Sequence, residues 1–460
     1  MRGPAGTRTA EVVDAIRRRL PTLAAGERLP SIRRLAESLG VSPSTVVESY
    51  ERLVAEGVVR SRPGSGFYVA RAGAPPALAA ATTPADRAID PLWVSRQSLD
   101  AGPETLRPGC GWLPADWMPQ SALRRAVRDL ARAEDGVLAD YGQTLGSPAL
   151  RRILSRRAED EGIGIGPDDV LLTASGTQAL DLVCRALLRP GDAVLLDDPC
   201  YFNFRALLRA HGATVIGVPY TPTGPDPVRF AEILATQAPR LYVTNSALHN
   251  PTGATLSPQT AHRLLTAAAA HDLVIVEDDT FADLEPEPSP RLAALDGLER
   301  VIRIGSFSKT LSASIRCGYV AARPDRIEAL ADLQVATGFG GPSPVAARLV
   351  LGTLGDGSYR RHLDALRRRL ARARRETAAR LADLGVSPWL MPRGGFSLWC
   401  RLPDGRDAAE VARAALSEGV VLAPGAVFSP SRTATDFMRF NVAQMGEPRI
   451  FDVLRRSLAA

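Results

Sequence analysis

Lysine is almost absent from this chain of 460 residues, although positive charge is abundant. Of its 56 lysine and arginine side chains only one is a lysine, Lys309. Arginine replaces lysine wherever a simple cation is sufficient, but a guanidinium stays protonated and forms no imine. A lysine that is retained at a single position is therefore a candidate for a nucleophilic amine. The alternative is a lysine kept by chance on a solvated surface.

Cysteine and histidine are also scarce, with five of each. The cysteines are scattered, odd in number and never spaced as C-x-x-C, so the sequence indicates neither a disulfide framework nor a zinc site. The histidines show no metal-ligand spacing either, and we expect no bound metal. This composition fits a reducing cytoplasm.

Long hydrophobic runs are missing as well. No apolar stretch approaches the roughly 20 residues that a membrane-spanning helix needs, and the polar residues 1–10 do not form the pattern of a signal peptide. We therefore expect no membrane association. Hydrophobic and charged contents of 45% and 23% are those of an ordinary globular protein, and the length is sufficient for two or three domains.

The net charge of +6 is unevenly distributed. Residues 1–72 contain 12 arginines against seven acidic residues, which indicates a polyanionic partner for this segment, although a solvated basic face has the same composition. Residues 71–90 are rich in Ala and Pro and lack periodicity, which predicts an extended linker. We place the domains at 1–70, a linker at 71–95, and a large domain at 96–460.

Three helices and a hairpin are predicted before the linker. Apolar periodicity predicts helices over 9–20, 31–39 and 42–56, the last two each beginning at a serine that can cap it. Residues 58–69 alternate around a Pro-Gly-Ser-Gly turn and predict a β-hairpin. This is the order of a winged helix-turn-helix, which places its recognition helix in the major groove of DNA. A helix-turn-helix used only for protein contacts is the alternative.

Residues 26–69 resemble the GntR-type winged helix-turn-helix over nearly its full length. The LPS opening, the LA..LGVS turn, the TV..SYE.L..EG helix and the PGSG wing follow one another in order. The resemblance implies that hydroxyls and a guanidinium bind phosphates or base edges, and that a glycine lets the wing approach closely. The DNA contacts so implied are Arg33, Ser42, Ser44, Thr45 and Gly66. Pro43 stands where many relatives have an arginine, so the operator sequence does not follow from the resemblance.

Short apolar strands alternate with helical stretches over most of the remaining chain. The strands are predicted at 170–174, 193–197, 241–245, 273–278 and 301–306. Helices between most of them indicate mostly parallel pairing. From about residue 355 to 460, a long arginine-rich helix and strand–helix–strand character predict a smaller C-terminal α/β lobe. The fold class is therefore α/β, preceded by the winged helix-turn-helix.

Residues next to these strands provide the groups that a pyridoxal 5'-phosphate site needs. An acid at a strand end fits a protonated pyridine nitrogen, and a glycine that opens a helix fits a phosphate. An amide fits the ring oxygen, and a tyrosine fits stacking on the ring. These residues are Asp278 for the pyridine nitrogen, Gly176 with Thr177 and Gln178 for the phosphate, Asn250 for the ring oxygen and Tyr201 for stacking. Each also has a plain structural interpretation as a cap, a turn or a core aromatic.

From about 109 to 442 the chain resembles class I aminotransferases of fold-type I, because the NPTG, ED-D, SFSK and R.GY elements stand in order. The resemblance implies that Lys309 holds pyridoxal 5'-phosphate as the internal aldimine and that Asp278 pairs with the pyridinium. It implies that Tyr141 reaches in from a partner subunit and that Arg439 clamps a substrate carboxylate. For Arg439 a surface strand arginine is the alternative. The residues it assigns to the phosphate are Thr177, Ser306, Ser308 and Arg316.

One position departs from this resemblance. Aminotransferases usually have a tyrosine three residues after the pyridine-binding acid, hydrogen-bonded to the ring oxygen, whereas Phe281 stands here. Without the phenol the imine is less finely tuned for proton transfer. We therefore expect little or no complete transaminase turnover.

A GntR-type winged helix joined by a linker to an aminotransferase-like domain is the architecture of the MocR group of bacterial regulators, which the whole chain resembles. The resemblance implies a cytoplasmic, pyridoxal phosphate-dependent transcription factor that binds double-stranded operator DNA and dimerises head-to-tail. It implies an effector, either an amino compound or pyridoxal phosphate itself, that acts at Lys309. Two alternatives stay open. The first is a working aminotransferase with an attached DNA-binding domain, and the second is a DNA-binding protein with a cofactor-free dimerisation module.

Overall fold

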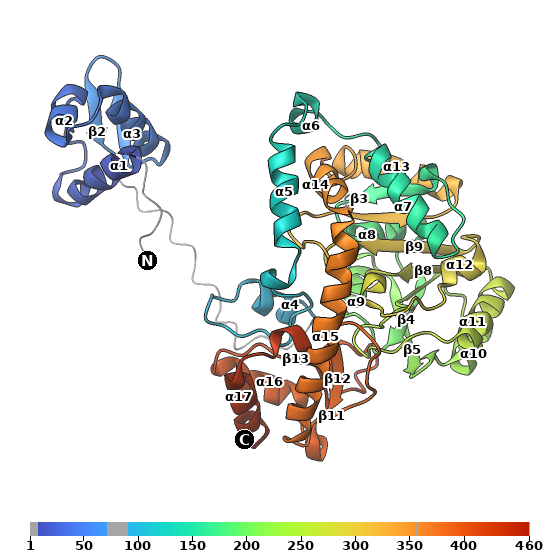
Figure 1. The fold of residues 1–460 in the computed structure, drawn as a ribbon. Helices are drawn as coiled ribbons and strands as arrows, with labels where there is room; N and C mark the ends of the chain where they lie inside the picture. The colour runs from blue at the N-terminus through green and yellow to red at the C-terminus, as the bar shows by residue number, and fades with distance from the viewer. Residues whose placement is uncertain (1–7, 71–90, 356, 460) are drawn as a thin grey trace. The chain divides into compact units, whose positions relative to one another are not determined.

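The computed structural model describes residues 8–70, 91–355 and 357–459 (Figure 1). Within the chain there are two compact units, Met1–Asp86 and Arg87–Ala460. Each unit has its own hydrophobic core and is described by itself.

The predicted linker, 71–95, is only partly covered by the structure, since 71–90 lie outside the described residues. Residues 91–95 are helical, because helix α4 spans Pro91–Leu99. A proline is favourable at the first position of a helix. Because the preceding segment is rich in Ala and Pro, the sequence does not predict the start of this helix. The helix begins before the predicted domain boundary at residue 96.

The N-terminal unit contains the predicted helices and hairpin. Its elements are α1 (Arg8–Arg19), the short 3-10 helix η1 (Leu20–Thr22), α2 (Ile32–Leu39), α3 (Pro43–Ala55), β1 (Val59–Arg62) and β2 (Gly66–Val69). The two strands pair in antiparallel orientation. The predicted winged helix-turn-helix is thereby confirmed.

Local capping fixes where the helices of this unit begin and end. Ser31 Oγ accepts the N–H of Arg34 at 3.4 Å, and Ser42 Oγ accepts the N–H of Thr45 at 3.2 Å. Gly40 ends α2 with a φ of 59°, which favours glycine. The apolar faces of the helices meet in one core, which includes Val12, Val13, Ile16, Leu35, Val46, Tyr50 and Leu53.

An eight-stranded sheet forms the centre of the second unit. Its order is β3-β10-β9-β8-β7-β4-β5-β6. The strands are β3 (Val170–Thr173), β4 (Ala193–Asp198), β5 (Thr214–Thr221), β6 (Gly224–Pro225), β7 (Leu241–Thr244), β8 (Val274–Asp278), β9 (Val301–Ser306) and β10 (Gly318–Ala321). Neighbours from β9 to β5 are parallel, whereas β10 is antiparallel to β3 and β9. The five predicted strands are present and mostly parallel; β5, β6 and β10 were not predicted.

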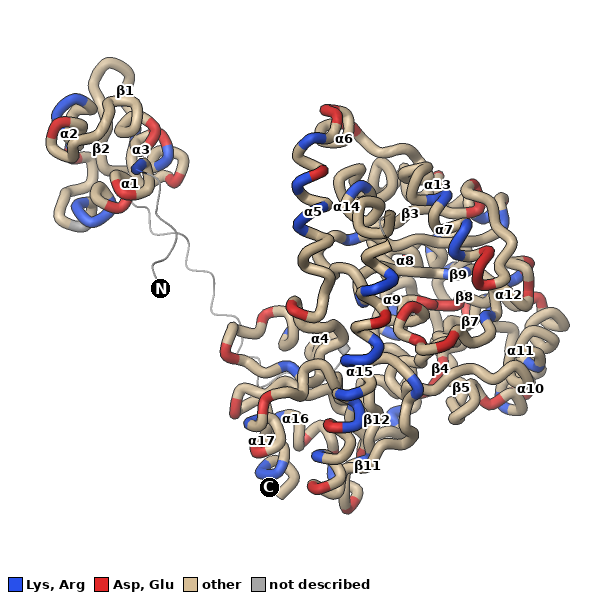
Figure 2. Tube along the Cα trace, viewed as in Figure 1, with Lys and Arg blue, Asp and Glu red and all other residues tan. Residues whose placement is uncertain are grey.

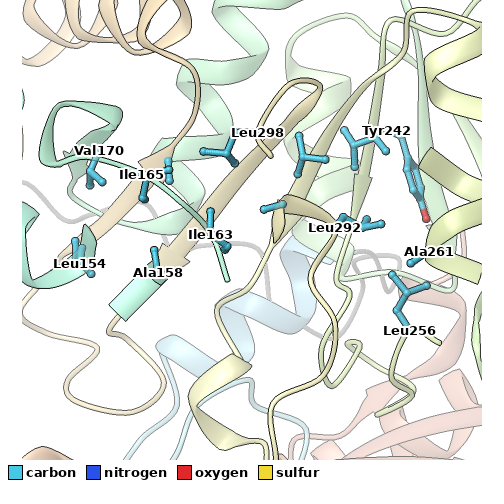
Figure 3. Close-up of a cluster of buried hydrophobic side chains, with 14 of the residues drawn as sticks. Leu154, Ala158, Ile163, Ile165, Val170, Tyr242, Leu256, Ala261, Leu292 and Leu298 are labelled. Carbon is cyan, nitrogen blue, oxygen red and sulfur yellow. The ribbon is translucent and has the colours of Figure 1, made fainter. Parts of the chain in front are cut away.

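Helices cover both faces of this sheet. The helices of this part of the chain are α5 (Gln120–Leu130), α6 (Asp135–Ala139), α7 (Pro148–Asp160), α8 (Gly176–Leu187), α9 (Phe202–Ala210), α10 (Pro227–Thr236), α11 (Pro258–Ala270), α12 (Leu292–Asp296), α13 (Pro324–Gly338) and α14 (Pro344–Leu354), of which α6 contributes no buried residue. One face packs in a core that includes Leu154, Val170 and Ala261 from α7, β3 and α11 (Figure 3). On the other face Leu171 packs with residues of α8, α9 and α13. Burial on both faces explains why the central strands are continuously apolar.

A smaller lobe follows the large sheet domain, as predicted. The long helix α15 (Ser358–Ala382) leads into a four-stranded antiparallel sheet of order β11-β12-β14-β13. These strands are β11 (Ser387–Pro388), β12 (Ser397–Arg401), β13 (Ala423–Pro424) and β14 (Phe437–Asn441), and the accompanying helices are α16 (Ala408–Ser417) and α17 (Pro448–Ala459).

Three findings bear on compartment and metal binding. All five cysteines are buried and free. In the described ranges no helix is long and apolar enough to cross a membrane. The same ranges contain no group of three or more His, Cys, Asp or Glu side chains that could hold a metal ion.

Candidate functional site

A cavity of about 530 Å³ lies at the carboxyl ends of the parallel strands of the large sheet. This is where open α/β sheets bind ligands. Nine of the eleven cofactor residues expected from the sequence line it, namely Lys309, Asp278, Asn250, Tyr201, Gly176, Thr177, Ser306, Ser308 and Arg316. They follow different strands and are therefore brought together by the topology of the sheet, not by closeness in sequence.

Lys309 presents its amine to this cavity from the segment after β9. Its Nζ donates a hydrogen bond to the backbone oxygen of Gly111 at 2.6 Å. Burial and, to a smaller extent, the charge of Arg439 lower the pKa of Lys309 to about 8, although the charge of Asp278 opposes the shift. A substantial fraction of the amine is therefore neutral near pH 8, which a nucleophilic amine requires.

Asp278 is the last residue of β8, and its carboxylate lies in the same cavity. The N–H of Thr280 donates to its Oδ1 at 3.0 Å, and Asn245 Nδ2 donates to its backbone oxygen at 2.9 Å. Burial raises the pKa of Asp278, and the positive charge of Lys309 lowers it. An acid held in such a buried position favours a cationic partner.

A corner that fits an anion lies at the start of α8. The free N–H groups of Gly176 and Thr177 begin this helix, where the helix dipole favours negative charge. Ser306 Oγ and Ser308 Oγ lie 3.1 Å apart, and Arg316 also lines this cavity. A Cβ at Gly176 would stand 3.4 Å from a side-chain carbon of Ile304, which is ordinary van der Waals contact. Backbone N–H groups, hydroxyls and a guanidinium together fit a phosphate.

Two of the expected cofactor residues do not line the cavity. Gln178 turns back toward β3, where its Oε1 accepts the N–H of Ala174 at 2.6 Å; its own N–H donates to Ser175 Oγ at 3.0 Å. Tyr141 is 79% exposed, and its ring centroid lies 5.0 Å from that of Phe339.

Arg439 lies behind Asn250 and not in the cavity wall. Its Nη1 donates to Asn250 Oδ1 at 3.0 Å and its Nη2 to the backbone oxygen of Gly109 at 2.6 Å, while its Nε has no hydrogen-bond partner in the part of the chain that the structure describes. Arg439 is 1% exposed, which excludes the alternative of a surface strand arginine. Burial lowers its pKa to about 10. A buried guanidinium that pairs with no carboxylate among the described residues favours an acidic ligand.

Phe281 also lines the cavity, in a T-shaped contact with Phe396 at a centroid distance of 5.5 Å. A phenyl ring offers no hydrogen-bond donor. The nearest residue in sequence with a hydroxyl is Thr280, which also lines the cavity.

One wall of the cavity was missed by the sequence analysis. It comes from α4, whose contributing residues are Leu92, Ser95, Arg96 and Leu99. The Ala- and Pro-rich composition before α4 predicts a linker that extends to residue 95. Trp112, Asn203 and Asn245 also line the cavity, and no motif in the sequence distinguishes them.

The residues expected to contact DNA lie on the surface of the N-terminal unit. Arg33 is exposed on α2, one of the basic stretches visible in Figure 2. At the start of α3, Ser42 Oγ lies 2.8 Å from both Ser44 Oγ and Thr45 Oγ1. Gly66 begins β2 with a φ of 108°, a conformation that side chains rarely adopt.

Two family models match the chain, one for each unit. Residues 8–69 match the bacterial regulatory proteins of the gntR family, and residues 113–456 match aminotransferase class I and II.

Several known proteins resemble the chain over nearly all of its length. The HTH-type transcriptional regulator YdcR of Escherichia coli (strain K12) is 31% identical over 92% of each chain. The HTH-type transcriptional regulator TauR of Rhodobacter capsulatus is 32% identical over 94% of this chain and 91% of its own. Among solved structures, the alpha-aminoadipate aminotransferase LysN of Thermus thermophilus is 28% identical, with a TM-score of 0.73 over 80% of this chain and 94% of its own.

These matches define a regulator with a GntR-type DNA-binding unit and a fold-type I aminotransferase domain. The similarity to the HTH-type regulators YdcR and TauR extends over both units of the chain. The chain belongs to the MocR group of GntR-type transcriptional regulators. It is thus a transcription regulator that binds DNA, and its large domain is of the class whose cofactor is pyridoxal 5'-phosphate.

Proposed function

We propose that this regulator senses an amino compound, or pyridoxal phosphate itself, at Lys309 and changes its affinity for operator DNA in response. The observation that carries the proposal is a buried amine with a pKa of about 8 in one cavity with Asp278, in a chain that also has a winged helix. The bound cofactor would supply an aldehyde that exchanges between amines. As a regulator of transcription, the protein would act in the cytoplasm.

Different residues around the cavity would hold different parts of the cofactor. Lys309 would provide the attachment point, and Asp278 would keep the ring nitrogen protonated. Asn250 would donate to the ring oxygen, and Tyr201 would stack on the ring. Thr177, Ser306, Ser308 and Arg316 would hold the phosphate at the start of α8.

Arg439 binds the acid group of an amino acid effector. In the structure its Nη1 bonds to Asn250, so carboxylate binding would exchange this contact or share it. A bidentate contact would also satisfy the free Nε–H. The effector thus carries an amine for the cofactor and an acid for this guanidinium.

Regulation follows from linkage. An effector that binds one conformation of the large domain better than another shifts the equilibrium between them. If operator DNA also distinguishes these conformations, effector and operator change each other's affinity by the same factor, with couplings of about 1–3 kcal/mol in typical cases.

Reduction with borohydride tests the attachment directly. The holo-protein is reduced, digested and mapped by mass spectrometry, with Lys309→Ala as the matched control. We expect cofactor mass on the peptide that contains Lys309 and none on the control. Cofactor at another site, or none, would contradict the proposal and favour the cofactor-free dimerisation module.

A working aminotransferase is the second candidate function. The protein named 2-aminoadipate transaminase of Thermus thermophilus is 30% identical over 76% of this chain and 90% of its own, and a lysine amine with a pKa of about 8 also fits catalysis. The production of keto acids from amino acids distinguishes a working aminotransferase from the amine sensor. Sustained turnover at about 1 per second or faster would favour the enzyme, and turnover that ends after one equivalent would favour the sensor.

The proposed function also includes the formation of a dimer. Related aminotransferases are typically dimers, and we propose a head-to-tail arrangement in which Tyr141 reaches the cavity of the partner subunit. The exposure of Tyr141 and Phe339, at 79% and 68%, supports an interface there.

A further inference from the structure

We infer that Tyr359 and His362, two side chains of helix α15, are positioning residues for Lys309 and hold its amine in the cavity by fixing Thr310. The inference rests on the proposed function and deepens it, because it concerns how the sensing amine is directed. Neither side chain lines the cavity, so both act on the amine through the residue that follows it in the chain.

Helix α15 is anchored in two hydrophobic cores. Its first turns contain Tyr359 and Leu363, which are buried in a core of the large sheet domain. Further along the helix, Leu366 and Leu370 are buried in the core of the C-terminal lobe. The helix runs without a break from one part to the other (Figure 1). Side chains on its first turns are therefore held by packing, which a precise support for another segment requires.

The hydroxyl of Tyr359 joins α15 to the residue after Lys309. It lies 2.6 Å from Thr310 Oγ1 and donates to Asp283 Oδ2 at 2.7 Å. Burial and, to a smaller extent, the charge of Asp283 raise the pKa of this phenol, so it stays protonated. Because its single proton goes to the carboxylate, Thr310 Oγ1 is the donor in the other contact. The direction of the Thr310 hydroxyl is thereby fixed.

His362 holds the backbone of the same residue. Its Nε2 lies 3.0 Å from the backbone oxygen of Thr310, and since a carbonyl only accepts, the ring nitrogen donates. Burial lowers the pKa of His362, and the bond to this carbonyl opposes the shift. A neutral ring with its proton on Nε2 makes this bond. Thr310, which is 1% exposed, is thus held by one helix at its hydroxyl and at its carbonyl.

A fixed residue 310 limits where the neighbouring amine can lie. The stem of a lysine is flexible, so its amine keeps one place only if the backbone beneath it is held. Lys309 Nζ donates to the backbone oxygen of Gly111 at 2.6 Å, and Phe307 and Leu311 on either side are buried in the core that contains the start of α15. If Thr310 is released, we expect the amine to leave Gly111 and the buried position that lowers its pKa.

The chain has a single lysine, which permits a direct test in the apo-protein. Lysine labelled with carbon-13 at Cε gives one signal, whose chemical shift follows the protonation of the amine. Thr310→Val should raise the pKa of Lys309 from about 8 by roughly one unit, toward the ordinary value of about 10.4. Uptake of pyridoxal phosphate at pH 8 should then slow about 5-fold, because the neutral fraction falls from about one half to about one eleventh. Thr310→Ser keeps the hydroxyl and should retain both values.

Variants of α15 assign the effect to this helix. Tyr359→Phe and His362→Leu each remove one contact with Thr310 and should raise the pKa of Lys309. His362→Gln retains a side-chain N–H donor and should restore part of the shift. The matched control is Thr353→Val, at a buried threonine of α14 outside the cavity whose hydroxyl donates to the backbone of its own helix. It should lower the thermal midpoint and leave the pKa of Lys309 unchanged.

The outcomes separate this inference from the proposed function. A pKa of Lys309 that stays at about 8 in Thr310→Val, Tyr359→Phe and His362→Leu overturns the positioning role, even where these variants are less stable, and leaves the amine sensor intact. A shift in Thr310→Ser as large as that in Thr310→Val also overturns it, because the hydroxyl would then not hold the amine. The proposed function fails by a different result, namely the absence of cofactor on Lys309 after reduction with borohydride.

Discussion

Lys309 is the residue on which the proposed chemistry of the large unit depends. Its pKa of about 8 means that half of the amines are neutral at pH 8, whereas an ordinary lysine, with a pKa of about 10.4, would be almost fully protonated. Because the neutral amine attacks an aldehyde, the rate of pyridoxal phosphate uptake by the apo-protein should rise with pH and level off above about 8. Stopped-flow absorbance measures this rate. A rise that continues to pH 10 would show that burial does not set the reactivity of this lysine.

Phe281 is the residue at which the proposed cofactor site departs from the aminotransferase pattern. A phenol at this position donates a hydrogen bond that stabilises a negatively charged ring oxygen and so lowers the pH at which the bound cofactor loses its proton. Phe281→Tyr should therefore shift the midpoint of the cofactor's absorbance titration to lower pH, by roughly one unit for a contact worth about 1.4 kcal/mol. Phe396→Tyr, next to it in the core, is the control. An unchanged midpoint in Phe281→Tyr would mean that its ring does not reach the cofactor's oxygen.

Single residues differ in how far the sequence predicts them. Asp278 and Asn250 are predicted because each belongs to a motif of the aminotransferase resemblance at or after the end of a buried strand, and the parallel sheet brings such positions together. The side chain of Gln178 could not be predicted, since the backbone N–H of Ala174 competes with any ligand for it. Arg439 was placed on a strand correctly, but its contact with Asn250 depends on the packing of two lobes.

Substitutions of two serines at the start of helix α3 distinguish an effect on folding from an effect on DNA binding. Ser42 Oγ caps the helix, so Ser42→Ala should destabilise the N-terminal unit by about 1 kcal/mol. Ser44 is exposed and accepts no backbone N–H, although its Oγ lies 2.8 Å from Ser42 Oγ, so Ser44→Ala should destabilise the unit less than Ser42→Ala and should weaken operator binding. Differential scanning calorimetry measures the first effect and fluorescence anisotropy the second. If Ser44→Ala binds the operator normally, the contact assigned to Ser44 is wrong.

Whole elements are predicted well where one periodicity dominates. The strands β7 and β8 are continuously buried and stood out as apolar runs, whereas β5 has exposed and half-buried residues along its length and gave no such run. Helix α4 has only nine residues and a weak pattern, so that the Ala- and Pro-rich stretch before it dominated the prediction. Tertiary packing of Trp93 and Val94 fixes this helix, and no single-sequence signal reports it.

The assembly of the whole molecule gives a further prediction. Tyr141 and Phe339 form an exposed aromatic pair, and burial of such a pair in a dimer is favourable. Phe339→Asp should therefore shift the protein from dimer to monomer in light scattering, because it places a charge in the interface. Aspartate tolerates the positive φ of this position. Val228→Asp, at a 60% exposed valine on α10, should remain a dimer, and a dimeric Phe339→Asp would place the interface elsewhere.

The chain joins a proposed cofactor site to a DNA-binding unit. The central claim is that ligand binding at Lys309 changes the affinity for DNA. The most direct test is the affinity for a duplex that the protein selects from a random pool, measured by anisotropy with and without pyridoxal phosphate. For the unaltered protein we predict that the Kd changes by about 5-fold or more, the lower end of typical couplings, and that it does not change for Lys309→Ala. Equal affinity of the apo- and holo-protein, before and after addition of amino compounds, would contradict the account.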